Sequence, residues 1–452
     1  MVERSKPSSL ALRGSCLGAI VASGLLAAGC SDSLPSMPRF SDLNPFAEKQ
    51  VPLPGKRVPV SLAEGKMGAD LASGDRPVIL PPTIANDAWT QPGGVATNAP
   101  GHLALGSSIK VTWSSDAGQG SSSRGRLISS PIVAEGRVFT LDTAALVTAF
   151  NAASGAIVWR SSLTPENEKG GKGAGGGLAF EGGRLYAATG YGNVVAIDPA
   201  SGKKLWEKSL GSPVRASPTA HGGRVYILAL DGVLYTLNGA DGTEAWVHKG
   251  LPEKASIVSN SSPAVDGTSV VIPYPTGELV TVNATNGAQT WSESLARARV
   301  ASSLTAMSDA ARPAIDNGVV FAVGHAGRMV AASARTGERL WTINVPSIQA
   351  PWVAGETVFV VDTSGQLMAL TRREGRAVWT VKLPGGSIWS GPVLAGGRLW
   401  LVSDKGTLVG VEAVTGRVDV QQNLGAPSFI SPIVAGGRMY VLTDKARLIA
   451  LN

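Results

Sequence analysis

Short apolar runs alternate with glycine-rich turns along most of the chain, from about residue 107 onward. In one stretch, apolar segments at 130–134, 137–141 and 146–150 follow one another, and a turn at 151–155 leads to a last segment that ends in Trp159. Each run is short, rich in β-branched residues and bounded by Gly or Asp, which is typical of a β-strand. The pattern predicts an all-β protein whose antiparallel strands are joined by tight turns.

The turn and the strand after it recur seven times. Each turn begins with a polar or acidic residue and ends in glycine, and in six copies a tryptophan follows four residues later; the seventh copy has Val420 there. The pairs are Gly155–Trp159, Gly202–Trp206, Gly242–Trp246, Gly287–Trp291, Gly337–Trp341 and Gly375–Trp379, with Gly416 heading the seventh copy. Successive turn glycines lie 38 to 50 residues apart. Four short strands in that length make one blade of a β-propeller.

Counting the segments gives the number of blades. Eight segments read as inner strands, but only seven turn-and-outer-strand units accompany them; the inner segments begin near Pro131, Gly177, Pro218, Pro263, Pro313, Pro351, Pro392 and Pro432. The segment 109–113, which ends in Trp113, looks like the end of a repeat without its beginning. The sequence therefore predicts an eight-bladed β-propeller over 107–452, with four antiparallel strands per blade and the N-terminal strand pairing with the C-terminal blade, which removes exposed sheet edges.

The turn residues have distinct expected roles. The Asp, Asn or Ser that opens the turn can accept hydrogen bonds from backbone amides just ahead, and the glycine supplies the positive φ of a tight hairpin. An indole is large enough to pack across the edge of a blade. One tryptophan per blade, Trp113 included, is thus expected to form a girdle between blades.

The first thirty residues resemble the signal peptide of a bacterial lipoprotein. Arg4, Lys6 and Arg13 precede an apolar run that is too short to span a bilayer permanently, and this run ends in Leu-Ala-Ala-Gly-Cys at Cys30. The resemblance implies a signal peptide at 1–29, a lipidated Cys30, and retention at the outer membrane because Ser31 follows. Residues 30–106, rich in Pro and Ser near their start, read as a lipidated tether. The alternative is an ordinary signal peptide with an incidental cysteine.

Composition narrows the functional classes. With 44% apolar residues in 452, the chain can bury a sizeable core, which excludes disorder of the whole chain. The formal charge of +7 is spread thinly, without a block of five basic residues, so nucleic-acid binding is not supported. Cys16 and Cys30 are the two cysteines, and both lie before the repeats, so no disulfide is expected in the propeller.

The repeats resemble those of pyrroloquinoline-quinone propellers, and together with the lipobox, the tether and the single eight-bladed domain they resemble the BamB family. The resemblance implies a scaffold without catalytic activity, cofactor or metal. It implies an outer-membrane lipoprotein that faces the periplasm, docks on the POTRA domains of BamA within the BAM complex, and supports insertion of outer-membrane β-barrels. Unfolded barrel proteins are further candidate partners. Fold alone does not establish this function.

In the family, two neighbouring loops carry the contact with the partner. The resemblance places one of them at Met307-Ser308-Asp309, ahead of Arg312, and the other at 255–260, where Ile257, Val258 and Asn260 are the candidate contacts. The second loop lacks the arginine of the family pattern. Arg297, Arg299 and Arg312 lie in the same stretch and are the candidates to supply a charge instead. Asp309 is the first candidate; the alternative is an aspartate that caps a turn.

The main rival function is that of a quinoprotein dehydrogenase, which needs Ca²⁺ held by carboxylate and amide oxygens and an aspartate beside the quinone. The chain has no cysteine after Cys30 to cover such a cofactor. Its four histidines lie in different repeats without ligand spacing, and the glycine run 170–177 lacks a phosphate-loop signature. A propeller that binds another envelope protein or a polysaccharide is the remaining alternative.

Overall fold

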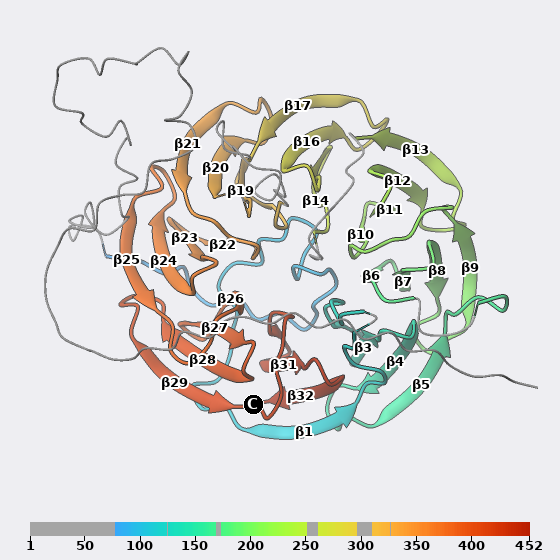
Figure 1. The fold of residues 1–452 in the computed structure, drawn as a ribbon, viewed down its shortest axis with the longest axis horizontal. Coiled ribbons are helices and arrows are strands. Elements are labelled where there is room, and N and C mark those ends of the chain that lie inside the picture. The colour runs from blue at the N-terminus through green and yellow to red at the C-terminus, as the bar shows by residue number, and fades with distance from the viewer. Residues whose placement is uncertain (1–76, 124, 169–172, 251–260, 296–309, 326) are drawn as a thin grey trace, which may run out of the picture. The chain divides into compact units, whose positions relative to one another are not determined.

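Eight four-stranded antiparallel sheets form a closed ring in the computed structural model of the protein (Figure 1). The structure describes residues 77–123, 125–168, 173–250, 261–295, 310–325 and 327–452. Each sheet is one blade, and consecutive blades follow one another around the ring. The predicted eight-bladed β-propeller is therefore confirmed. No helix among these residues is long and apolar enough to cross a membrane.

Blades 1 to 7 each take four consecutive strands, from the channel outward. Blade 1 consists of β2 (Ile132–Ala134), β3 (Arg137–Leu141), β4 (Leu146–Asn151) and β5 (Ile157–Ser162), and blade 2 of β6 (Gly176–Glu181), β7 (Arg184–Thr189), β8 (Asn193–Ile197) and β9 (Lys204–Ser209). Blade 3 consists of β10 (Thr219–His221), β11 (Arg224–Leu228), β12 (Val233–Asn238) and β13 (Glu244–Lys249), and blade 4 of β14 (Ala264–Asp266), β15 (Ser269–Pro273), β16 (Glu278–Asn283) and β17 (Gln289–Ser294). Blade 5 consists of β18 (Ala314–Asp316), β19 (Val319–Val323), β20 (Arg328–Ser333) and β21 (Arg339–Asn344), and blade 6 of β22 (Trp352–Ala354), β23 (Thr357–Val361), β24 (Gln366–Thr371) and β25 (Ala377–Lys382). Blade 7 consists of β26 (Trp389–Ala395), β27 (Arg398–Ser403), β28 (Thr407–Glu412) and β29 (Val418–Asn423), and blade 8 of β30 (Ile433–Ala435), β31 (Arg438–Leu442) and β32 (Arg447–Leu451) with β1 (Val111–Asp116).

Burial differs between the inner and outer strands of a blade. In blade 1, β3 and β4 bury four residues each, whereas β5 alternates between exposed and half-buried positions. The middle strands pack against neighbouring blades on both faces, and so they read as continuous apolar runs. This packing is also why charged residues are only 16% of the chain: most strand positions lie away from water.

The first and the last three of the described strands build the eighth blade. Strand β1 pairs antiparallel with β32, with Trp113 opposite Ala450, and the backbone of Lys110 exchanges two hydrogen bonds with Asn452. Figure 1 shows the C-terminus beside β1. The predicted closing strand at 109–113 lies two residues early, because β1 continues to Asp116. The pairing closes the ring, as the sequence predicted.

Each girdle tryptophan packs on the turn glycine of the following blade. Trp206, on blade 2, lies over Gly242 of blade 3. A Cβ added to Gly242 would meet the Trp206 ring at 2.6 Å, and the Trp206 Nε1 donates a hydrogen bond to the Gly239 carbonyl at 3.0 Å. The same pair of contacts recurs from Trp113, Trp159, Trp246, Trp291, Trp341 and Trp379 to the next turn in each case. An indole on glycine thus joins blade to blade.

The absence of a tryptophan at Val420 has a physical reason. Val420 lies in β29, the outer strand of blade 7, and would face a turn between the third and outer strands of blade 8. In blade 8 these two strands are β32 and β1, the last and the first of the described strands, so no glycine turn joins them. An indole at 420 would have no such surface to cover.

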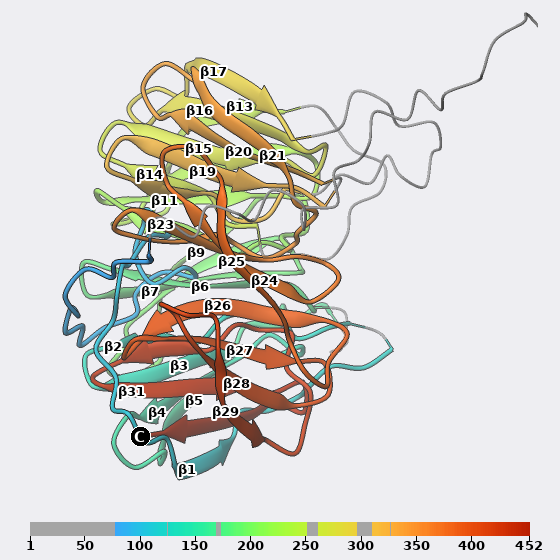
Figure 2. The same ribbon diagram turned by 90° about the vertical axis from the view of Figure 1, so that its left-hand side faces the viewer.

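Residues 84–104 form a segment, here called the collar, that runs around the channel on one face of the ring. Its backbone and side chains hydrogen-bond the blades in chain order: Asn86 bonds blade 8, Trp89 blade 1, Thr90 blade 2, Gln91 blades 2 and 3, Ala96 blade 4, Thr97 and Asn98 blade 5, Gly101 blade 6 and Leu103 blade 7. Figure 1 shows this blue segment around the centre, and Figure 2 shows it along one side of the ring.

The collar satisfies backbone groups on the inner edge of the sheets. The amides of Val133, Phe180, Val265 and Ile315, each on an innermost strand, donate to collar carbonyls at 2.8–2.9 Å. These edges would otherwise present unpaired donors to the channel. The sequence predicted a tether over 30–106, but within that range residues 77–106 belong to the folded unit, where they bond the blades and pack into the core. The strand repeat did not predict this part of the fold, because the collar makes single hydrogen bonds to the inner edges of the blades and is not itself a strand of the repeat.

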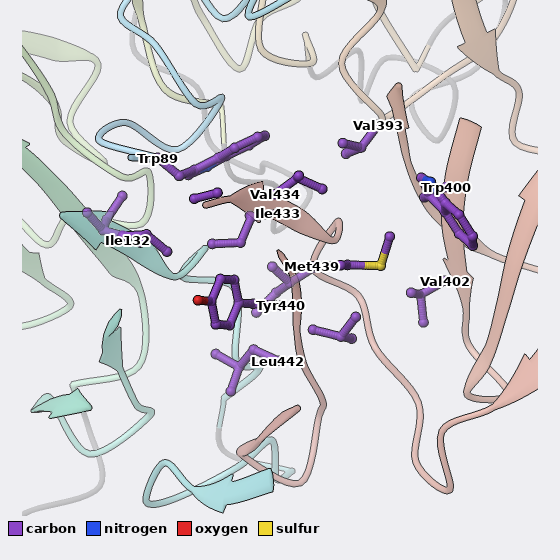
Figure 3. Packing of buried hydrophobic residues seen from close by; sticks show 14 of the residues in the cluster. Trp89, Ile132, Val393, Trp400, Val402, Ile433, Val434, Met439, Tyr440 and Leu442 are labelled. Carbon is purple, nitrogen blue, oxygen red and sulfur yellow. The ribbon is translucent and has the colours of Figure 1, made fainter. Parts of the chain in front are cut away.

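One collar side chain is anchored in the largest core cluster. Trp89 is 2% exposed and packs with residues of blades 1, 7 and 8. Figure 3 shows it among Ile132, Ile433 and Val434. Its ring also stacks on Trp352 of blade 6, with centroids 6.4 Å apart. The collar is therefore packed into the core as well as hydrogen-bonded to it.

Candidate functional site

The face opposite the collar carries the candidate site. On this face the chain enters each innermost strand, and the residues just before these strands line the end of the channel. Two adjoining cavities, of about 110 and about 20 Å³, occupy the channel and share Ser130, Arg312, Ala350 and Ser431 in their walls. We call the larger cavity the channel mouth; it is lined by Arg126, Ile128, Ser130, Arg312, Ile348, Gln349, Ala350, Ile388, Phe429, Ile430 and Ser431.

Most residues predicted to contact a partner lie outside the described residues. These are Ile257, Val258 and Asn260 in one segment and Ser308 and Asp309 in the other, and Cys30 also lies outside. Connectivity still constrains both segments: one joins β13 to β14 and the other joins β17 to β18.

Arg312 is the predicted contact residue that the structure does describe. It lies two residues before β18, is half-buried, and lines both channel cavities. Among the described residues its guanidinium has no hydrogen-bond or ion-pair partner. Burial lowers the pKa of Arg312 to about 10, which still leaves the side chain cationic at neutral pH.

A second arginine and an aromatic ring form the opposite part of the wall. The Arg126 guanidinium carbon lies 4.0 Å from the centroid of the Phe429 ring, a cation–π contact. Arg126 is exposed, and Phe429 is half-buried. Ile348 and Ile388 extend this wall and also line an adjacent cavity of about 260 Å³. The channel mouth is thus basic with an apolar rim.

The collar lines the smaller cavity behind the mouth. Trp89 and Asn98 line the 20 Å³ cavity together with Arg312. The Nε1 of Trp89 and the Oδ1 of Asn98 are buried and have no hydrogen-bond partner. A cavity of this size holds about one water molecule. The smaller cavity therefore joins the channel mouth to the buried polar atoms of the collar.

The residues of this pocket do not fit the metal of a quinoprotein. Ca²⁺ takes six to eight oxygen ligands, several of them carboxylates, and no Asp or Glu lines either channel cavity among the described residues. Nor do the described ranges hold any group of three or more His, Cys, Asp or Glu that could hold a metal. Of the histidines, His102 bonds the Pro81 carbonyl and the Gly397 amide, fixing the collar to blade 7.

Sequence reasoning missed Arg126 and Phe429, which the fold brings to Arg312 from blades that are distant in the chain. One signal was available. In seven blades a proline stands at the entry to the innermost strand, and the residue before it is Ser130, Ser217, Ser262, Arg312, Ala350, Gly391 or Ser431. Six of these residues are small, and Arg312 is the exception.

Comparison with known proteins gives the following matches. Residues 95–169, 143–381 and 369–452 match the family described as "Outer membrane protein assembly factor BamB". The factor of that name from Yersinia pestis is 24% identical over 216 residues, which cover 47% of this chain and 55% of the relative. The chain thus spans about half the length of such curated relatives.

Two solved structures have similar folds. The crystal structure of BamB from Moraxella catarrhalis matches with a TM-score of 0.66 and 16% identity, over 76% of this chain and 100% of that one. The quinohemoprotein alcohol dehydrogenase ADHIIG from Pseudomonas putida HK5 matches with a TM-score of 0.66 and 13% identity, over 81% and 80%. At these identities the likeness shows the fold alone.

Proposed function

Since the chain belongs to the BamB family of outer membrane protein assembly factors, we propose that it is a non-catalytic scaffold of the outer-membrane β-barrel assembly complex. In this proposal the propeller is anchored to the periplasmic face of the outer membrane through lipidated Cys30. It docks on the POTRA domains of BamA through the face that bears the channel mouth. A rigid ring holds loops at fixed positions, and loops so held commonly carry binding functions.

The observation that carries the proposal is the family match over residues 95–452, which covers the collar's later part and all eight blades. The make-up of the channel supports a binding role over redox chemistry. An enzyme of the quinoprotein class, with which the fold is shared, needs carboxylates beside its cofactor, whereas the described channel walls present Arg126 and Arg312. We therefore favour the scaffold over the dehydrogenase.

Charge reversal in the predicted docking loop tests the partner. We expect Asp309→Lys to reduce co-purification of the barrel-assembly protein from detergent-solubilised envelope at least fivefold, because a like charge would replace a complementary one at the contact. The matched control is Glu168→Lys. Glu168 is an exposed acidic residue between β5 and β6, and this segment joins blade 1 to blade 2 as the segment of Asp309 joins blade 4 to blade 5. Equal recovery with both variants would remove Asp309 from the interface, and failure to recover the complex even with the unmutated chain would count against the scaffold role.

Membrane fractionation tests the anchor. We expect Cys30→Ser to move the protein from the membrane to the soluble fraction, because the lipid would have no thiol to join. Cys16→Ser, which changes the other cysteine, is expected to leave attachment unchanged. A Cys30→Ser protein that still sediments with membranes would contradict lipidation at this residue.

A further inference from the structure

The channel mouth has the chemistry of a ligand site. It combines two cationic side chains, Arg126 and Arg312, with an apolar rim, and its described wall contains no carboxylate. We propose that the channel mouth binds a carboxylate group carried on an apolar body. This inference stands on the geometry of the mouth and does not depend on the scaffold role.

Arg312 is where the carboxylate is expected to bind. At the equivalent position of six other blades the residue is Ser, Ala or Gly, so an arginine is not needed to build the channel wall. Its guanidinium is half-buried and has no carboxylate or carbonyl partner among the described residues. A desolvated cation without a partner is costly, and a planar guanidinium matches a carboxylate with two parallel hydrogen bonds. A bound carboxylate would supply what the site lacks.

The rest of the mouth selects what carries the carboxylate. Phe429 holds the Arg126 guanidinium at 4.0 Å, which fixes the second cation at the rim. Ile128, Ile348 and Ile388 line the same cavity, and Ile388 is 42% exposed although it is a large apolar residue. An apolar group bound there would cover this surface.

The size of the site limits the ligand to a small group or a chain end. The mouth encloses about 110 Å³, and the adjoining cavity that Trp89 and Asn98 help to line adds only about 20 Å³. The carboxylate could therefore belong to a small organic acid or to the C-terminus of another polypeptide, two sources that present the same chemistry to Arg312.

Calorimetric titration of the purified full-length protein distinguishes these sources. The probes are N-acetyl-leucine and its amide, and a pair of hexapeptides that end in leucine, one with a free carboxylate and one amidated. We expect each acid that binds to do so at least tenfold more tightly than its amide. Binding of the hexapeptide acid alone would identify a chain end as the ligand; binding of both acids with similar affinity would show that the site recognises the terminal group itself.

Two variants tie the binding to the mouth. We expect Arg312→Met, which keeps the length of the side chain, and Arg126→Gln, which changes an exposed side chain, each to weaken binding of the acid at least tenfold. The control is Arg373→Met, an exposed arginine on blade 6, which should bind like the unmutated protein. Equal affinity for acid and amide, unchanged affinity in Arg126→Gln, or no binding of any probe at millimolar concentration would each overturn the proposal.

Discussion

Replacing Gly242 with alanine should lower the free energy of unfolding by about 3 kcal/mol, whereas the same change at Gly223 should lower it by about 1 kcal/mol. Both glycines have a φ of +73°, so both alanines incur the same backbone strain. Only at Gly242 does the new Cβ meet an indole, 2.6 Å from the Trp206 ring; at Gly223 nothing lies within 4 Å. Chemical denaturation of both variants gives the comparison.

The difference between the two variants isolates the contact between blades. Since the φ values match, a larger loss at Gly242 measures the cost of moving Trp206 away from the turn of blade 3. Trp206 would also lose its hydrogen bond to the Gly239 carbonyl, which is 3.0 Å long. Equal losses at the two positions would show that the turn glycines are selected for backbone conformation alone and that the indole packing is incidental.

Gln91→Met should destabilise the protein by about 3 kcal/mol, because three hydrogen bonds of a buried side chain are lost together. The Gln91 Nε2 donates to the carbonyls of Phe180 and Ala220 at 3.0 and 2.9 Å, and its Oε1 accepts from the Ala220 amide at 2.9 Å. The side chain is 3% exposed, so water cannot replace these partners. Methionine keeps the volume of glutamine but offers neither the donors nor the carbonyl oxygen.

Hydrogen exchange shows whether this effect acts where the collar joins blades 2 and 3. In Gln91→Met the Ala220 amide should exchange faster than in the unmutated protein, because its acceptor is gone. Gln421→Met changes an exposed glutamine on β29 and should alter neither stability nor the exchange of Ala220. If Gln91→Met proves as stable as the Gln421→Met control, the collar rests on the ring without stabilising it.

The repeat could be predicted because it is local. The glycine turn, the polar residue that opens it and the tryptophan four residues later recur at the spacing of one blade, and each of these choices reflects a preference of the backbone within a few residues. Closure of the ring also followed from counting strands, since one outer strand was missing at one end of the pattern and present at the other. That closure occurs between β1 and β32.

The collar and the channel mouth were beyond such reasoning. Residues 84–104 have neither a strand period nor a turn repeat, because each collar residue bonds the edge of a blade that lies far away in the chain. Arg126 and Phe429 likewise meet Arg312 only because the ring brings the entries of blades 1, 5 and 8 to one opening. Arg312 itself was proposed for its place in the sequence near the docking loop, and the structure places it in the channel wall.

The sequence alone determined the repeating unit and the number of repeats: a four-stranded blade that occurs eight times, with a tryptophan that packs on the turn glycine of the next blade. These features depend on contacts within a blade or between neighbours, and such contacts leave a period in the sequence. Only the tertiary structure decided that part of a segment predicted to be a tether bonds the inner edges of all eight blades, and that two arginines line one cavity at the opposite face. Those arrangements join residues from several blades at once, and a contact made once, across the centre of a ring, leaves no period to detect.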